Sequence, residues 1–245
     1  MGQLLGLKKP VAKDFHLMKY DLVFLDADDT LFDFGAAEAN AFGRTLSDFK
    51  LAHDSSVFSL YQEINQALWQ DLEKGLVNQE TLRVERFRRL FDAIGGNINP
   101  VDFAQSFTTW LGKGTFLLPG AEELCRNLAG KIIQVVLTNG IKDVQESRLR
   151  LSALRPWIDH LVISEEAGSQ KPNREIFEYA LKKVGPIPLD RMIIVGDSLT
   201  SDIQGGVNFG IDTCWFNPAE KPRRQGIEPT FEIKALSELG PILLA

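Results

Sequence analysis

The stretch "DLVFLDADDTLFDF", residues 21–34, decides how the rest of this chain is interpreted. Its four consecutive apolar residues, 22–25, are typical of a strand that is buried on both faces of a sheet. They run directly into Asp26, Asp28 and Asp29. Crowded carboxylates repel one another and lose water at the end of a buried strand, which is costly unless a positive group lies between them. The stretch therefore predicts either a solvated turn or a site for a cation or a cationic partner.

Four later runs share the apolar character of the first and lack the alternation of a half-exposed strand. They are "IIQVVLT" (132–138), "HLVIS" (160–164), "MIIVGD" (192–197) and "IDTCWFN" (211–217). Helical patterns accompany these runs at residues 120–130, 144–154 and 173–185. Strands and helices in this alternation predict an α/β fold with a doubly wound, parallel, Rossmann-like sheet.

The alternation breaks between the first and second apolar runs. Amphipathic helical patterns fill this interval, at residues 38–49, 59–75, 79–95 and 100–112. We therefore predict an inserted, all-helical cap domain over residues 36–115. The catalytic core would then comprise residues 19–35 and 116–245, preceded by an N-terminal extension of residues 1–18.

Composition narrows the classes of partner. The 245 residues are 44% hydrophobic and carry a net charge of −6, which disfavours a nucleic acid polymer but not a small phosphorylated substrate. No apolar run reaches the roughly 18 residues of a membrane helix, and the N-terminal apolar stretch is too short for a signal peptide. We expect a cytoplasmic protein that acts on a small molecule without a membrane, as a monomer or dimer, with Cys125 and Cys214 as buried reduced thiols.

Polar residues follow the predicted strands, at the edge where open α/β sheets bind ligands. Asp26 and Asp28 are two residues apart, so an extended backbone would project them the same way, ~6–7 Å apart. Such a pair can divide nucleophilic attack and proton transfer between its members. Alone, the motif is also compatible with a solvated turn that holds helix-capping aspartates.

Three more motifs are each unremarkable when taken singly. The sequence "LTNG" (137–140) offers a threonine hydroxyl and backbone N–H groups that suit a phosphate oxygen, or it is an ordinary turn. Lys171 in "SQKP" is a loop lysine that matters only if it meets the carboxylates. Asp197 and Asp202 form a second acidic pair, suited to Mg²⁺ or simply to a helix N-terminus.

The four motifs in this order resemble the haloacid dehalogenase superfamily of aspartate-nucleophile phosphohydrolases, over residues 19–236. The resemblance implies that Asp26 attacks phosphorus and that Asp28 protonates the leaving group and then activates water. It also implies phosphate-binding and Mg²⁺-binding residues, which are Thr138, Asn139 and Lys171 for the phosphate and Asp26, Asp28, Asp197 and Asp202 for the metal. Phosphoryl transfer depends mostly on positioning and charge neutralisation, and these residues can supply both.

Other activities of the same scaffold remain as alternatives. The 2-haloacid dehalogenases of the superfamily work without Mg²⁺ and without a second aspartate two residues after the first, so Asp28 argues against that activity. A non-catalytic sensor of phosphorylated ligands should have lost Asp26, Asp28 or Lys171, and all three are present. A phosphomutase is not excluded by the sequence.

Within the superfamily, three stretches resemble bacterial pyrimidine nucleoside 5′-monophosphate phosphatases. These are residues 160–181, "ALWQDLEKG" (67–75) and "RFRRLF" (86–91). The resemblance implies a nucleotidase, with a phosphatase of a sugar phosphate or phosphoglycolate as the alternative. Trp69 and Phe87 are candidates for contact with a base, although aromatic residues at helical spacing more often lie in a core. The arginines at positions 83, 86, 88 and 89 are interpreted mainly as a solvated face.

Overall fold

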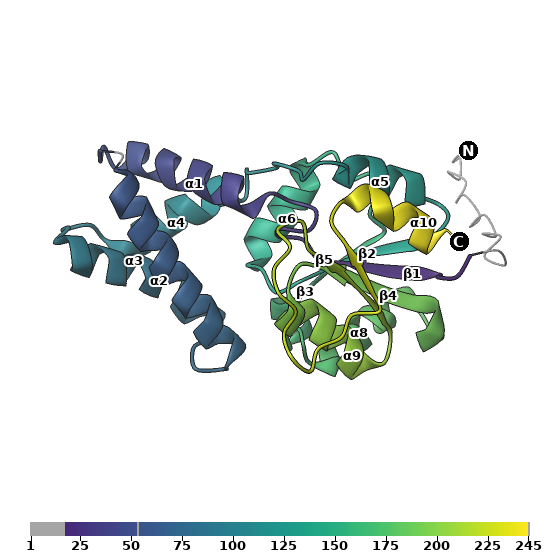
Figure 1. The fold of residues 1–245 in the computed structure, drawn as a ribbon. Coiled ribbons are helices and arrows are strands. Elements are labelled where there is room, and N and C mark those ends of the chain that lie inside the picture. Colours follow the sequence, from purple (N-terminus) through teal and green to yellow (C-terminus); the bar gives the residue numbers. More distant parts are fainter. Residues whose placement is uncertain (1–17, 53, 245) are drawn as a thin grey trace, which may run out of the picture.

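The structure is a computed structural model that describes residues 18–52 and 54–244, so the predicted extension, apart from Met18, lies outside the described residues. Its centre is a parallel sheet of six strands in the order β3-β2-β1-β4-β5-β6 (Figure 1). The strands are β1 (Leu22–Leu25), β2 (Ile133–Thr138), β3 (His160–Ile163), β4 (Met192–Gly196), β5 (Asp212–Phe216) and β6 (Phe231–Ile233). The predicted fold class is confirmed. Strand β6 was not predicted, because its three residues are too few to form an apolar run.

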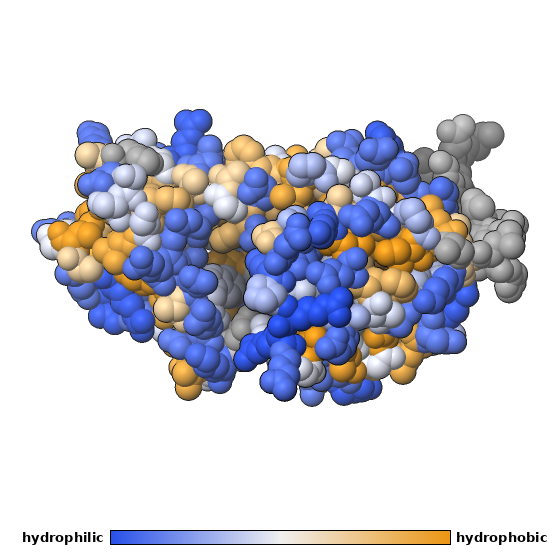
Figure 2. All heavy atoms as spheres, in the orientation of Figure 1, coloured by the Kyte–Doolittle hydropathy of each residue, from blue (hydrophilic) through white to orange (hydrophobic). Residues whose placement is uncertain are grey.

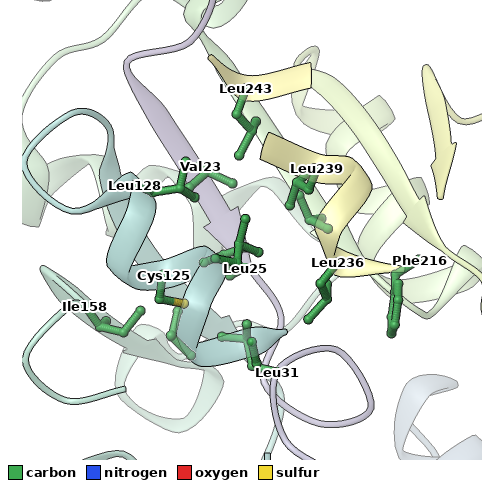
Figure 3. Packing of buried hydrophobic residues seen from close by; sticks show 14 of the residues in the cluster. Val23, Leu25, Leu31, Cys125, Leu128, Ile158, Phe216, Leu236, Leu239 and Leu243 are labelled. Carbon is green, nitrogen blue, oxygen red and sulfur yellow. The ribbon is translucent and has the colours of Figure 1, made fainter. Parts of the chain in front are cut away.

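Two helical layers cover the sheet. Val23 and Leu25 face a cluster that includes Cys125 and Leu128 of α5 (Ala121–Leu128) and Leu239 of α10 (Leu239–Leu243), as Figure 3 shows. The alternate residues of β1 face the other layer, which contains α8 (Arg174–Val184) and α9 (Gln204–Phe209). Helices α6 (Lys142–Leu151) and α7 (Ser164–Ala167) follow β2 and β3. Because β1 lies at the centre and is buried on both faces, the residue that follows it lies in the middle of the sheet edge.

Four helices between β1 and α5 form the cap, which lies beside the sheet as a separate helical body (Figure 1). They are α1 (Phe34–Asp48), α2 (Ser55–Glu73), α3 (Gln79–Ile94) and α4 (Pro100–Leu111). Helices α1 and α2 begin four residues earlier than the sequence pattern predicts, because the carboxylates of Asp33 and Asp54 accept hydrogen bonds from their first-turn N–H groups.

The cap joins the core through two short segments that pair with each other. The N–H of Leu118 donates to the carbonyl of Leu31 at 3.0 Å, and the N–H of Asp33 donates to the carbonyl of Phe116 at 3.0 Å. An antiparallel bridge between Phe32 and Leu117 lies between these bonds. The cap is therefore attached next to the end of β1, close to the predicted site.

Both cysteines are free and buried, and burial raises the pKa of each thiol to about 12. This confirms the prediction of buried reduced thiols. None of the helices in the described part of the chain is both long and apolar enough to cross a membrane.

Candidate active site

The turn after β1 sends Asp26 and Asp28 to different partners. The chain bends directly after Asp26, since the N–H groups of Leu31 and Phe32 both donate to the carbonyl of Ala27, at 3.0 and 2.9 Å. The side chains of Asp26 and Asp28 nevertheless line the same cavity. The carboxylate of Asp28 accepts hydrogen bonds from two residues of α6, Gln145 at 2.6 Å and Arg148.

Lys171 lies between carboxylates that come from distant parts of the sequence. Its ammonium is 2.5 Å from Asp26 Oδ1 and 2.6 Å from Asp202 Oδ1, and it donates to the carbonyl oxygen of Leu137 at 2.6 Å. Only 1% of the Lys171 side chain is exposed, so these groups replace its water. The structure thus brings together the lysine and carboxylates that the motifs predicted.

Asn139 holds the backbone of Lys171. Its Oδ1 accepts from the Lys171 N–H, and its Nδ2 donates to the Lys171 carbonyl, both at 2.9 Å. The side-chain amide of Asn139 therefore positions Lys171, a role that the sequence did not indicate, while Asn139 also lines the cavity. Thr138, at the end of β2, accepts a hydrogen bond from the Gly140 N–H at 3.0 Å and lines the same cavity.

A π-helical turn, Leu199–Ile203, places Asp202 against the end of β4. The Asp202 carboxylate accepts from the N–H of Ser198 at 3.0 Å. A Cβ atom on Gly196 would lie 2.2 Å from this carboxylate, so a glycine is required there for the close approach. The backbone carbonyl of Asp197 accepts a hydrogen bond from the indole N–H of Trp215 at 2.9 Å. This bond fixes the backbone that carries the Asp197 carboxylate.

Three carboxylates form a candidate metal site. Oxygen atoms of Asp26, Asp197 and Asp202 all lie within 4.8 Å of one another. Oxygen donors of this kind suit Mg²⁺. The buried ammonium of Lys171 and the exposed ammonium of Lys221, 3.5 Å from Asp197, leave the three carboxylates with an excess of negative charge that a divalent cation would neutralise. The carboxylate of Asp28 is not part of this group, so its predicted role as a metal ligand through that carboxylate is corrected.

The electrostatics of the site reflect this excess. Burial, opposed by Lys171 and reinforced by Asp202 and Asp197, raises the pKa of Asp26 well above its ordinary value. Burial together with the charges of Asp202 and Asp29 raises the pKa of Asp197 to about 7. Burial alone would lower the pKa of Lys171, but the charges of Asp202 and Asp26 outweigh burial and raise it, so the ammonium stays charged. The cluster is thus organised for an additional positive charge.

A cavity of about 280 Å³ opens above the cluster, and the surface is recessed between the cap and the core (Figure 2). Its walls include the motif residues and three cap residues, Phe34, Trp69 and Leu72. Trp69 thus lies where a substrate contact was predicted.

The corresponding prediction for Phe87 is wrong. Its side chain is completely buried in the cap core and stacks on Tyr61, with ring centroids 5.4 Å apart, because it lies on the inner face of α3. Its neighbour Arg86 is 1% exposed and donates to Asn65 at 3.2 Å, so it does not belong to a solvated face either.

Comparisons with known proteins decide the family. The model of the haloacid dehalogenase-like hydrolases matches residues 20–210. The chain belongs to this family. The pyrimidine 5′-nucleotidase YjjG of Escherichia coli is 36% identical over 92% of this chain and 99% of its own, and the pyrimidine 5′-nucleotidase PynA of Streptococcus pneumoniae is 34% identical over 91% and 94%.

A solved structure of the HAD-hydrolase YfnB of Bacillus subtilis, bound to magnesium, is also similar to this chain. It is 36% identical and superposes with a TM-score of 0.86 over 92% of this chain and 99% of its own. The resemblance drawn from the four motifs, including its likeness to pyrimidine nucleotidases, is confirmed by these comparisons.

Sequence reasoning missed Arg148 and Gln145 of this haloacid dehalogenase-like site. Arg148 is fully buried, bonds Asp28, and donates to the carbonyl of Gly114 at 3.0 Å. The sequence did indicate that Arg148 is buried, because it follows the apolar Val144 by four residues and so lies on the same face of the predicted helix. Gln145 reaches Asp28 across Gly140, where a Cβ atom would lie 2.2 Å from its amide nitrogen.

Proposed function

We propose that this protein is a Mg²⁺-dependent phosphomonoesterase that works through an aspartyl-phosphate on Asp26, with nucleoside 5′-monophosphates as substrates. The observation that carries the proposal is the buried contact between Lys171 and Asp26 at the floor of a cavity that also contains Asp197 and Asp202. A fixed carboxylate nucleophile, a cation beside it and a site for a divalent metal are what phosphoryl transfer requires.

The reaction would proceed in two displacements. A carboxylate oxygen of Asp26 forms a bond to phosphorus, and the bond from phosphorus to the 5′ oxygen of the nucleoside breaks. Asp28, positioned by Gln145 and Arg148 and carrying a proton at the start of this step, gives that proton to the oxygen. Asp28 then takes a proton from water, whose oxygen attacks phosphorus, and the bond from phosphorus to Asp26 breaks. Inorganic phosphate leaves, and both aspartates return to their starting states.

The remaining groups would hold charge in place. Lys171 would face the phosphoryl oxygens, while Asn139 keeps its backbone fixed. Asp26 and Asp197 would hold Mg²⁺, with Asp202 shared between the metal site and Lys171. When bound, Mg²⁺ supplies positive charge that neutralises these carboxylates and the phosphoryl group. Burial of these groups strengthens each interaction by excluding water.

The cap supports the choice of substrate. Trp69 and Leu72 give the cavity an apolar wall. The motif residues that line the rest of the cavity would contact only the phosphoryl group of a substrate, so this wall would contact the nucleoside. Stacking of a base on an aromatic ring contributes ~1–3 kcal/mol and tolerates different bases, so several nucleotides should be accepted. Two relatives of similar length, YjjG and PynA, are named pyrimidine 5′-nucleotidases.

A substrate panel tests this proposal. Purified protein with Mg²⁺ is assayed for phosphate release from dUMP, dTMP, UMP, AMP, a sugar phosphate and phosphoglycolate, and for chloride release from 2-chloropropionate after treatment with EDTA. We expect the highest kcat/KM for pyrimidine or deoxy nucleotides, activity on several of them, and no chloride.

Two results would contradict parts of the proposal separately. A preference of about tenfold or more for a sugar phosphate or phosphoglycolate, equivalent to ~1.4 kcal/mol, would remove the nucleotidase and leave the phosphatase. Chloride release with full activity in EDTA would instead establish the dehalogenase alternative.

A further inference from the structure

The first residue of cap helix α3 contacts the core beside the site. Nε2 of Gln79 donates to the carbonyl of Asn139 at 2.7 Å and to the hydroxyl of Ser164 at 3.2 Å. Helix α3 does not need this side chain to begin, because Asn78 already accepts from the Thr81 N–H at 2.8 Å. The amide of Gln79 therefore serves the contact between cap and core.

The residue that Gln79 contacts is the one that holds Lys171. The Asn139 backbone bonds the cap, and its side chain bonds both the N–H and the carbonyl of Lys171 at 2.9 Å. The Lys171 ammonium in turn lies 2.5 Å from Asp26. A continuous series of hydrogen bonds thus runs from the cap through Asn139 and Lys171 to the nucleophile.

Two further contacts attach the same part of the cap to the same part of the core. Nε2 of Gln170, the residue before Lys171, donates to the carbonyl of Leu72 near the end of α2 at 3.1 Å. Arg83, one turn after Gln79, donates to both carboxylate oxygens of Glu165 at 2.7 and 2.9 Å. The end of α2 and the start of α3 therefore dock around the segment that carries Lys171.

We propose that Gln79 is a positioning residue, which couples docking of the cap to the placement of the Lys171 ammonium against Asp26. The inference rests on the proposed role of Lys171 in phosphoryl transfer. Without the Gln79 amide, the Asn139 carbonyl bonds water in place of the cap. Asn139 and the Lys171 backbone that it holds are then no longer hydrogen-bonded to helix α3. A shift of about 1 Å in a reacting group can cost on the order of 10²-fold in rate, so even a partial release should be measurable.

The kinetic test compares Gln79→Ala with Glu80→Ala, its exposed neighbour on α3. A second variant, Gln79→Glu, keeps the size of the side chain but offers only acceptors to the Asn139 carbonyl when ionised. We expect both Gln79 variants to lower kcat about tenfold with KM changed less than about threefold, and Glu80→Ala to change neither.

A double-mutant cycle separates positioning from general damage. In an Asn139→Ala background the backbone carbonyl remains but the side chain no longer holds Lys171, so Gln79→Ala should then lower kcat by less than about twofold. An equal, additive loss in both backgrounds would overturn the proposal.

Amide hydrogen exchange gives a readout that needs no activity. Peptides that cover residues 138–142 and 169–173 should exchange faster in both Gln79 variants and at the wild-type rate in Glu80→Ala. Unchanged exchange in these peptides would overturn the proposed coupling. If the wild-type protein hydrolysed no phosphomonoester, the proposed function would fail, and this exchange measurement would still decide whether Gln79 holds the segment.

Discussion

At the scale of single residues, the crowded carboxylates make the metal-free protein less stable at neutral pH. The folded state raises the pKa of Asp197 to about 7, from an ordinary value of ~3.9. Between these two values the folded state binds more protons than the unfolded state, so the contribution of Asp197 to stability falls as the pH rises through this range. The charge that makes the site suitable for a cation is thus a cost when no cation is bound.

We therefore predict that Asp197→Asn stabilises the metal-free protein. The contact between Asp197 and Lys221, at 3.5 Å and with Lys221 well exposed, is too weak to offset the gain. Removing the buried charge should raise the free energy of unfolding by roughly 1–3 kcal/mol and Tm at pH 8 in EDTA by roughly 2–12 °C. Differential scanning fluorimetry with and without Mg²⁺ measures this.

The same measurement contains its own control, because Mg²⁺ should raise the Tm of the wild type and leave that of Asp197→Asn nearly unchanged. A lower Tm for Asp197→Asn than for the wild type in EDTA would show that the Asp197 carboxylate stabilises the metal-free fold, which would contradict this prediction.

The sequence predicts which residues form the centre of this site, but not where each one points. Asp26, Lys171 and Asp202 meet as expected because their positions follow from the ends of buried strands. The bond between the Asp28 carboxylate and Arg148, and the grip of the Asn139 side chain on the Lys171 backbone, were not predicted, since they depend on a tight turn and on an amide facing a backbone. Such local geometry leaves no periodic pattern in the sequence.

At the scale of elements, the cap helices show the same limit. Their number and amphipathic character are predictable, because each buries one stripe of apolar residues. Trp69 and Phe87 both fit that pattern, yet Trp69 lines the cavity and Phe87 lies in the cap core. Periodicity shows that an aromatic side chain is covered, but it does not show whether protein or substrate covers it.

A matched pair of substitutions separates the two aromatic residues. Trp69→Leu should raise KM for dUMP by ~5–150-fold, the equivalent of ~1–3 kcal/mol of stacking, and should leave KM for the small substrate acetyl phosphate nearly unchanged. Phe87→Leu should lower Tm, because it removes a ring from a close-packed core, and should leave both KM values nearly unchanged.

The reverse pattern, with KM for dUMP dependent on Phe87 and independent of Trp69, would show that the cavity is misassigned. Steady-state kinetics and a thermal melt on the same two preparations provide both readouts.

At the scale of the whole molecule, the sheet order creates the site. Strand β1 pairs with β2 and β4, and β3 pairs with the other edge of β2. The carboxyl ends of these neighbouring strands bring Asp26, which follows β1, to Lys171, which follows β3 and α7 and is 145 positions away in the sequence. The prediction of a doubly wound sheet was sufficient to infer this convergence. Strand β6 and the short helices near the carboxyl terminus were not predictable, because each is too short to show a period.

The position of an aspartate relative to the sheet should therefore decide its function. Asp21 and Asp26 flank β1, but Asp21 lies at the amino end and bonds Arg191 at 2.6 and 2.9 Å, far from the cavity. Asp26 lies at the carboxyl end against Lys171. The same substitution at both positions changes the same chemical group in two different places.

The most direct measurement of the central claim is the rate of phosphate release from dUMP in Mg²⁺ by Asp26→Asn, beside Asp21→Asn and the wild type. An amide cannot replace the carboxylate nucleophile, so Asp26→Asn should lose at least about a thousandfold in kcat while its circular dichroism stays that of the folded protein. Asp21→Asn should keep kcat within about twofold of the wild type. A folded Asp26→Asn protein that releases phosphate at the wild-type rate would contradict the assignment of Asp26 as the nucleophile.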